Sequence, residues 1–217
     1  GMTTLLVMSH GRRDCLTHAI DSVHSNLRGR IDNWVIHSDA PDPKFNDWVK
    51  QWWGGSLIVN EGERGFGNAI RNAWNHIDDD YIIHWEEDFL LKEEVNADLM
   101  RWILNTSPEL AQVALKRQPW NQQEKAMGGI IEQDPGSYTE ETRYGYVITK
   151  HRKFFTTNPC VYGRNVVELG WPEGSESEGR FGLKLWDAGL YSAYLGGKYE
   201  KPKVEHIGYE RANGGGY

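Results

Sequence analysis

Short hydrophobic runs alternate with helically spaced hydrophobic residues over the first part of the chain. The runs, which are typical of buried strands, cover residues 4–9, 33–37, 56–59 and 81–85. The segments between them repeat their hydrophobic residues every three or four positions, at Leu16, Ala19, Ile20 and Val23, at Phe45, Trp48, Val49 and Trp52, and at Ala69, Ile70, Ala73 and Trp74. Strands that alternate with helices predict a mostly parallel sheet flanked by helices.

The alternation is weaker after residue 92. Hydrophobic spacing predicts a helix over 99–104, a strand over 112–115, antiparallel strands at 146–148 and 154–155, a helix from near Phe181 to Gly189, and a strand over 191–195. The long polar segment 119–144 predicts a mobile or substrate-facing region.

Three successive carboxylates, Glu86, Glu87 and Asp88, interrupt the hydrophobic run that begins at Tyr81. Adjacent acids repel one another and are costly to bury without partners, so an external cation or polar ligand explains them. A solvated acidic turn before the next helix is the alternative, since carboxylates also suit the first turn of a helix. Hydrophobic residues on both sides favour the first explanation, because they keep the acids near the sheet.

The carboxyl ends of parallel strands form the ligand-binding edge of such sheets. Four polar or glycine-containing segments follow the predicted strands, at residues 9–13, 39, 62–68 and 86–88. We therefore expect these segments to converge on one rim.

Composition narrows the classes of function. The chain has 217 residues, 39% of them hydrophobic, which fits one large domain or a domain with a small appendage. Its net charge of −7 and the lack of a basic block argue against nucleic acid as the ligand and are compatible with a metal at an acidic site. No run approaches the roughly 18 apolar residues of a membrane-spanning helix, so we expect no transmembrane segment.

Cysteine and aromatic content add two expectations. Cys15 and Cys160 are far apart and lack CxxC spacing, so neither a disulfide framework nor a zinc knuckle is indicated, and we expect a reducing, cytoplasmic location. Ten tryptophans and ten tyrosines are many for this length. Rings in excess of the needs of a core often line sites for sugars and other ligands with apolar faces, whereas for any single tryptophan a place in the core is the favoured explanation.

Several motifs, in their order along the chain, resemble those of family-2-like glycosyltransferases with the GT-A fold. In the first half these are the loop Ser9-His10-Gly11-Arg12, the acid Asp39, the segment from Gly65 to Asn72, and Glu86-Glu87-Asp88 in place of a DxD-type motif. In the second half they are Thr157–Arg164, which resembles the floor of an acceptor site, Glu176-Ser177-Glu178, and the late segment Val204-Glu205-His206. Glu86 in place of Asp, Glu178-Gly179 in place of an acid pair, and the His10-Gly11 loop depart from the family pattern.

The resemblance implies one GT-A domain over residues 1–217, with a Rossmann-like, mostly parallel central sheet and a smaller antiparallel acceptor-side portion. The nucleotide-binding half would cover about 1–91, the acceptor-binding half about 92–210, and a flexible tail 211–217. The implied activity is transfer of a sugar from a nucleotide-diphosphate donor, with a UDP-sugar favoured, to a hydroxyl of a saccharide or other acceptor. The transfer would be inverting and would depend on Mn²⁺ or Mg²⁺.

The resemblance also assigns roles to residues. Asp88 and His206 would bind the metal, since hard cations take carboxylate oxygens and Mn²⁺ also accepts imidazole. Glu178 would be the general base, with Glu176 as the alternative. The nucleotide-sugar would be bound by Ser9, His10, Arg12, Asp39, Gly65, Asn68, Arg71, Glu86 and Glu87.

Two other functions remain open at this stage. A nucleotidyltransferase also uses a glycine-rich loop and metal-bound acids on an α/β sheet, but it usually has a more basic first loop than Arg12-Arg13 provides. A non-catalytic, transferase-like carbohydrate-binding protein would keep the aromatic surfaces without turnover. Nucleotide-sugar hydrolysis with and without Mn²⁺ distinguishes these alternatives.

Overall fold

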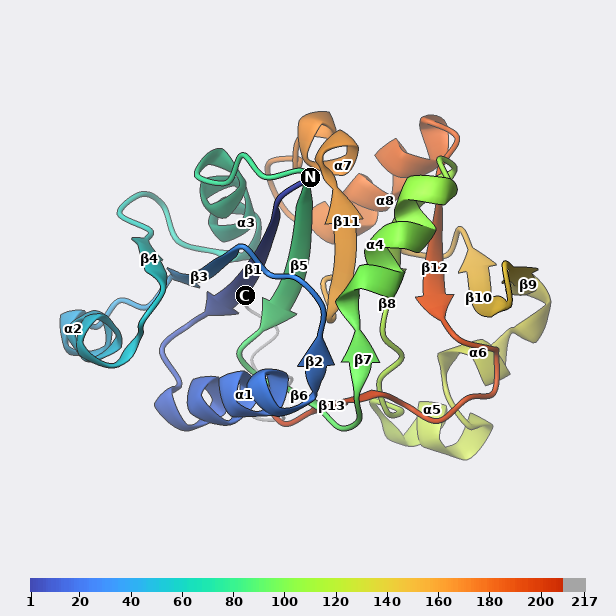
Figure 1. Ribbon diagram of the computed structural model, residues 1–217, viewed down its shortest axis with the longest axis horizontal. Helices are drawn as coiled ribbons and strands as arrows, with labels where there is room; N and C mark the ends of the chain where they lie inside the picture. The colour runs from blue at the N-terminus through green and yellow to red at the C-terminus, as the bar shows by residue number, and fades with distance from the viewer. Residues whose placement is uncertain (209–217) are drawn as a thin grey trace.

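A nine-stranded sheet runs through the computed structural model, which describes residues 1–208 (Figure 1). Its strand order is β4-β3-β1-β5-β11-β8-β12-β10-β9. The strands are β1 (Thr3–Ser9), β3 (Asn33–Ser38), β4 (Ser56–Val59), β5 (Tyr81–Glu86), β8 (Leu110–Ala114), β9 (Thr139–Arg143), β10 (Tyr146–His151), β11 (Cys160–Gly163) and β12 (Tyr191–Leu195). Within this sheet only β10 and β11 run against the other strands. The predicted mostly parallel sheet with an antiparallel portion is confirmed.

Helices cover both faces of the sheet (Figure 1). The hydrophobic cluster on one face includes residues of α1 (Arg13–Asn26), α2 (Pro43–Trp52) and α4 (Ala97–Thr106), and that on the other includes residues of α3 (Phe66–Asn75), α7 (Arg164–Leu169) and α8 (Ser177–Asp187). Strand β1 contributes Leu5 and Val7 to the first cluster and Leu6 and Met8 to the second. Alternate side chains of a strand point to opposite faces, so a run that is hydrophobic throughout fits a sheet buried on both sides.

Two small strand pairs lie outside the main sheet. Strand β13 (Val204–His206) pairs antiparallel with β6 (Phe89–Leu91), and β2 (Leu27–Arg28) pairs parallel with β7 (Val95–Asn96). The β13–β6 register sets His206 opposite Phe89. A residue late in the sequence is thereby carried to the acids that follow β5.

Two expectations about the second half need correction, the strand at 154–155 and the start of the helix near Phe181. Residues 154–155 form no strand; Phe155 is buried in the core, and the side-chain amide of Gln112 bonds the backbone of Thr156 in place of a neighbouring strand. The hydrophobic side chains at residues 154–155 therefore indicate burial in the core and not a strand that pairs with a neighbour. Segment 119–144 contains α5 (Gln122–Met127), α6 (Ile130–Gln133), the short 3-10 helix η1 (Pro135–Ser137) and β9. A mobile or substrate-facing role for this segment stays a prediction.

Helix α8 begins at Ser177, about one turn before Phe181, and ends at Asp187, just ahead of Gly189. Gly189 has a φ of 80°, a left-handed conformation that commonly ends helices.

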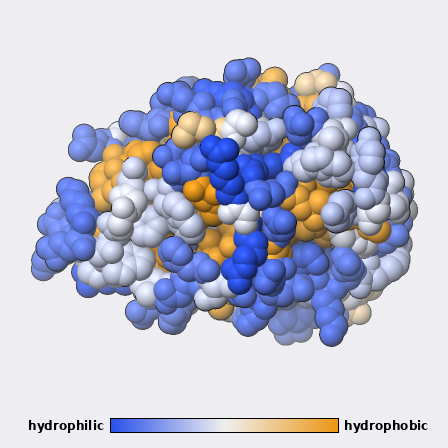
Figure 2. Space-filling model, viewed as in Figure 1, coloured by the Kyte–Doolittle hydropathy of each residue, from blue (hydrophilic) through white to orange (hydrophobic). Residues whose placement is uncertain are grey.

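The tail predicted over 211–217 lies outside the described residues, and the division into two halves near residue 91 stays a prediction. No helix within residues 1–208 combines the length and apolarity needed to cross a bilayer. Figure 2 shows one mostly hydrophilic face with hydrophobic residues visible between polar ones.

Acid should destabilise the fold through two buried histidines. Burial lowers the pKa of His37 and His151 to about 4, below the ordinary value of about 6.5. The unfolded chain therefore binds more protons than the folded chain between these values, and the free energy of unfolding should fall as the pH drops from about 6.5 to 4. We expect a loss on the order of 2–3 kcal/mol per histidine at pH 4.

Denaturant titrations at pH 7, 5.5 and 4 measure this loss. His151→Phe keeps a ring beside Phe154 and Tyr194 and should flatten the pH dependence, whereas His18→Gln on the exposed face of α1 should not. An unchanged slope in His151→Phe would show that His151 is not one of the responsible groups.

Candidate active site

The carboxylate of Glu87 holds the loop that follows β1. Strands β1 and β5 are parallel neighbours with Met8 opposite Glu86, so the polar segments after them emerge at the same edge. Glu87 is fully buried and accepts hydrogen bonds from Ser9 Oγ at 2.6 Å, from the His10 amide at 3.1 Å, and from Arg12 at its amide, 3.3 Å, and its Nε, 3.2 Å. The acid is thus satisfied by the loop that it organises.

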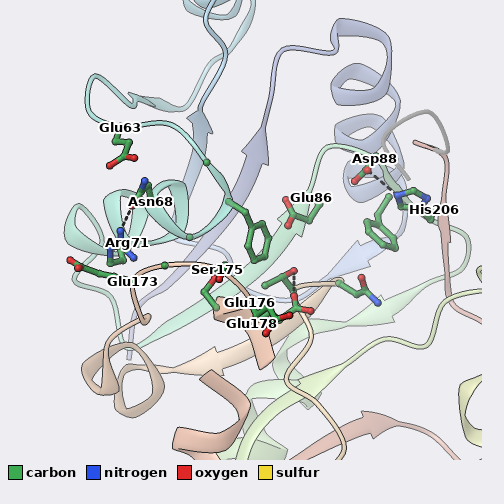
Figure 3. Close-up of a pocket in the computed structure, with 18 of the residues that line it drawn as sticks. Glu63, Asn68, Arg71, Glu86, Asp88, Glu173, Ser175, Glu176, Glu178 and His206 are labelled. Carbon is green, nitrogen blue, oxygen red and sulfur yellow. Dashed lines mark hydrogen bonds and ion pairs between the residues drawn. The ribbon is translucent and has the colours of Figure 1, made fainter. Parts of the chain in front are cut away.

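Asp88 lies between an arginine and a histidine from opposite ends of the chain. Its Oδ2 is 2.9 Å from Arg12 Nη2. The same oxygen is 2.9 Å from His206 Nε2, as the dashed line in Figure 3 marks. The side chain of Gln118 bonds both the backbone amide and the carbonyl of His206, each at 2.9 Å, and so fixes the position of β13. The predicted proximity of Asp88 and His206 is present in the structure.

Asp39 braces the glycine-rich segment. Its carboxylate accepts from Asn60 Nδ2 at 2.7 Å and from the Gly65 amide at 3.1 Å, while its backbone carbonyl accepts from Arg64 Nε at 2.8 Å. Gly65 has a φ of 128° and a ψ of 160°, a combination open almost only to glycine. The chain can therefore turn sharply into α3, and the predicted contact of Asp39 with a nucleobase stays a prediction.

Arg71 ties α3 to the loop ahead of α8. Its guanidinium donates to the side chain of Asn68 and, at 3.0 Å, to the carbonyl of Pro172. Gly67 permits this close approach, because a Cβ there would lie 3.1 Å from Ser177 Oγ and 3.2 Å from Trp171 Nε1. These contacts form one wall of the site.

The two candidate bases differ in environment. Glu178, in the first turn of α8, accepts a hydrogen bond from Thr157 Oγ1 at 2.8 Å. Burial raises the pKa of Glu178; the Thr157 hydrogen bond offsets this in part, and the nearby charge of Glu86 raises it further. Glu176 is exposed and has a left-handed φ of 53°, which is uncommon outside glycine.

A cleft of about 990 Å³ collects the residues of this edge (Figure 3). Of the candidate residues it is lined by Gly65, Asn68, Arg71, Glu86, Asp88, Glu176, Glu178 and His206. Ser9, His10, Arg12, Asp39 and Glu87 are not among its lining residues. The first group is placed to touch a ligand, while the contacts of Asp39 and Glu87 brace the loops behind it.

Sequence reasoning assigned no role to several other lining residues, namely Glu63, Phe66, Phe89, Trp120, Glu173 and Ser175. The Trp120 ring centroid lies 4.3 Å from that of His206, yet nothing near Trp120 in the sequence indicates this contact. The one feature of the sequence that could have pointed to Trp120 is the high number of aromatic residues in the chain. A tryptophan in a polar segment is a reasonable candidate for a ligand-facing ring.

Asp88 and His206 supply two ligand atoms of the kinds that Mn²⁺ accepts, an oxygen and an imidazole nitrogen. Within residues 1–208 no group of three or more His, Cys, Asp or Glu residues is arranged to hold a metal. The residues therefore fit a metal that takes its remaining ligands from a bound nucleotide and water, as Mg²⁺ commonly does at phosphate sites.

Similar solved structures define the class of fold. The chain matches a structure of GalNAc-T7 with UDP, GalNAc and Mn²⁺ at 12% identity and a TM-score of 0.67, over 95% of this chain and 44% of that one. It matches the mannosyltransferase PcManGT from Pyrobaculum calidifontis, in complex with GDP-Man and Mn²⁺, at 13% identity and a TM-score of 0.63, over 97% and 59% of the two chains. The protein therefore has the GT-A fold, and it spans about half the length of these two proteins.

The family follows from the sequence itself. The family model described as glycosyl transferase family 2 matches residues 4–168, which is most of the chain. The protein belongs to this family. A comparison with curated protein sequences finds no match.

The Glu87 contacts predict a stability defect. Glu87→Gln replaces a buried anion with a neutral amide, so the hydrogen bonds from Ser9 and Arg12 lose their charge assistance. We expect the free energy of unfolding to fall by about 1.5–3 kcal/mol. The exposed Glu94→Gln should change it by less than about 0.5 kcal/mol. Equal values for the two variants in chemical denaturation would show that Glu87 does not hold the loop.

Proposed function

We propose that this protein is an inverting, metal-dependent glycosyltransferase that moves a sugar from a nucleotide-diphosphate donor to an acceptor hydroxyl. The observation that carries the proposal is that one cleft joins the Asp88–His206 pair to Glu178, a partly desolvated carboxylate. Family membership supports it. A UDP-sugar remains the favoured donor, and the acceptor is a saccharide or another molecule that offers a hydroxyl.

Different residues of the cleft would bind the metal, bind the donor and orient the metal ligands. Asp88 and His206 would hold Mn²⁺ or Mg²⁺, which when bound stabilises the negative charge that develops on a departing diphosphate. Glu86 would accept hydrogen bonds from hydroxyl groups of the donor, since its carboxylate enters the cleft from the end of β5. Arg12 holds Asp88 through a charge-assisted bond and so orients a proposed metal ligand.

Glu178 is placed to take the proton of the attacking hydroxyl. A base is most effective when its pKa lies near the working pH, and burial moves Glu178 in that direction. Thr157 fixes one carboxylate oxygen, Oε2. Direct displacement assisted by such a base inverts the anomeric centre.

A second candidate is a nucleotidyltransferase. The observation that favours it is the match to a CMP:2-keto-3-deoxy-manno-octonic acid synthetase complexed with CTP, which covers 91% of this chain and 90% of that one at 13% identity and a TM-score of 0.56. The match thus covers nearly the whole length of both chains. Pyrophosphate release from a nucleoside triphosphate and a free sugar would identify this activity, whereas release of UDP from a UDP-sugar identifies the first.

Replacing the proposed base should separate catalysis from binding. Glu178→Gln should lower kcat by about 10²–10⁴-fold while donor and metal affinities change little. Glu176→Gln is the matched comparison, because Glu176 is exposed in the same cleft. UDP release from UDP-sugars, with a panel of saccharide acceptors, gives the rates. Near-full turnover in Glu178→Gln together with a large loss in Glu176→Gln would transfer the role to Glu176.

The pH dependence of kcat in the wild type tests the same assignment, because its acidic limb should report the ionisation of the base. A base must be ionised, so kcat should rise with pH through the raised pKa of Glu178, and this limb should lie above the ordinary pKa of about 4.3 for a glutamate. The limb should be absent in Glu178→Gln.

Metal dependence predicts a defect in Asp88 variants. Asp88→Asn should weaken UDP binding in the presence of Mn²⁺ and change it little without metal, because acids and phosphates repel each other unless a cation lies between them. His206→Ala should raise the Mn²⁺ concentration needed for half-maximal binding. Glu205→Gln is the control, since Glu205 lies next to His206 on β13 and pairs with Lys92, at 3.3 Å, instead of lining the cleft. Calorimetry measures each affinity, and unchanged Mn²⁺-dependent affinity in Asp88→Asn would remove Asp88 from the metal site.

A further inference from the structure

His84 lies directly behind Glu86 on β5. Residues two apart on a strand share a face, and the β1 partners of these two, Leu6 and Met8, both belong to the cluster on the α3, α7 and α8 side. His84 is 1% exposed. None of the roles proposed above uses this buried imidazole.

The hydrogen bonds around Tyr162 determine which nitrogen of His84 carries the proton. Trp74 Nε1 can only donate, and it donates to the Tyr162 hydroxyl oxygen at 2.8 Å. The arrangement in which the buried Tyr162 hydroxyl also donates its own proton directs that proton to His84 Nδ1, likewise at 2.8 Å. A neutral imidazole that accepts at Nδ1 carries its proton on Nε2.

The Nε2–H of His84 faces carboxylates. It is buried and has no hydrogen-bond partner among the described residues, and Glu86 Oε1 lies 3.9 Å from Nε2. Glu178 on α8 and Cys160 on β11 face the same space. Burial raises the pKa of the Cys160 thiol and of the Tyr162 phenol, so both are neutral near pH 7.

We propose that His84 is a positioning residue whose Nε2–H donates to Glu86 when a ligand fills the cleft and so fixes that carboxylate toward the donor. The Trp74–Tyr162 pair keeps the imidazole in the required tautomer. A separation of 3.9 Å exceeds a hydrogen bond, and such contacts at catalytic sites are often long without ligand and shorten in the complex. A buried donor with no partner is costly, which favours this closure. The inference rests on the proposed function.

Kinetic measurements test the role in catalysis. His84→Phe should raise the donor KM and lower kcat/KM on the order of 10–100-fold. It should also move the acidic limb of kcat to higher pH, because the His84 N–H, which favours the ionised form of Glu178, is lost. His84→Gln returns an amide N–H near the Nε2 position and should restore most of kcat/KM. His18→Gln, exposed on α1, should match the wild type.

A variant that merely weakens the fold would lower the melting temperature and leave the limb in place. That result in His84→Phe, or failure of His84→Gln to restore kcat/KM, would overturn the inference. If His84→Phe does not fold, Tyr162→Phe replaces it: the core keeps its ring, the tautomer loses its constraint, and kcat/KM should fall with the same shift of the limb.

Nitrogen-15 NMR of labelled histidine tests the arrangement without turnover. The wild type should show His84 as the Nε2–H tautomer, Tyr162→Phe should show a mixture, and Glu86→Gln should shift the Nε2–H proton whereas Glu205→Gln should not. An Nδ1–H tautomer in the wild type would overturn the inference whatever the enzyme does. The expected tautomer in a protein that transfers no sugar would instead overturn the proposed function and leave the His84 arrangement standing.

Discussion

The buried carboxylate of Glu87 is the group on which the ligand-binding edge depends. It receives the Ser9 hydroxyl, two loop amides and the Arg12 side chain, so the β1–α1 loop is folded around it. Arg12, once held there, also reaches Asp88, which in turn meets His206 on β13. An acid with no partners would cost several kcal/mol to bury, and this one is fully satisfied. One side chain thus aligns a loop, an arginine and a proposed metal ligand.

The parallel half of the fold could be predicted because its signals are local. Strand and helix periods alternate up to residue 91, and the strand ends converge as the chain order implies. The second half could not be predicted as well, because a hydrophobic residue that is buried there does not always belong to a paired strand. Phe155 is hydrophobic but lies outside any strand, since Gln112 bonds the neighbouring backbone. The start of α8 was placed too late because polar residues occupy its first turn.

In the candidate site too, some residues could be predicted from the sequence and others could not. Residues that reach the cleft, such as Glu86 and Asp88, follow from their place at the end of a buried strand. The roles of Asp39 and Glu87 in holding loops do not, because a carboxylate that contacts a ligand and one that accepts backbone amides look alike in sequence. Family resemblance placed both on the donor. Their hydrogen bonds show instead what each acid supports, and a donor contact by either remains a prediction.

The charge of the cleft constrains how a diphosphate can enter it. The described lining includes Glu63, Glu86, Asp88, Glu173, Glu176 and Glu178. Against these acids the same lining offers Arg71 and His206, and Arg71 already donates to Asn68 and to the Pro172 carbonyl. Such a surface repels phosphate and attracts cations. This charge supports the proposed metal dependence, because a divalent cation at Asp88 would let the phosphates of a donor approach the acids of the cleft.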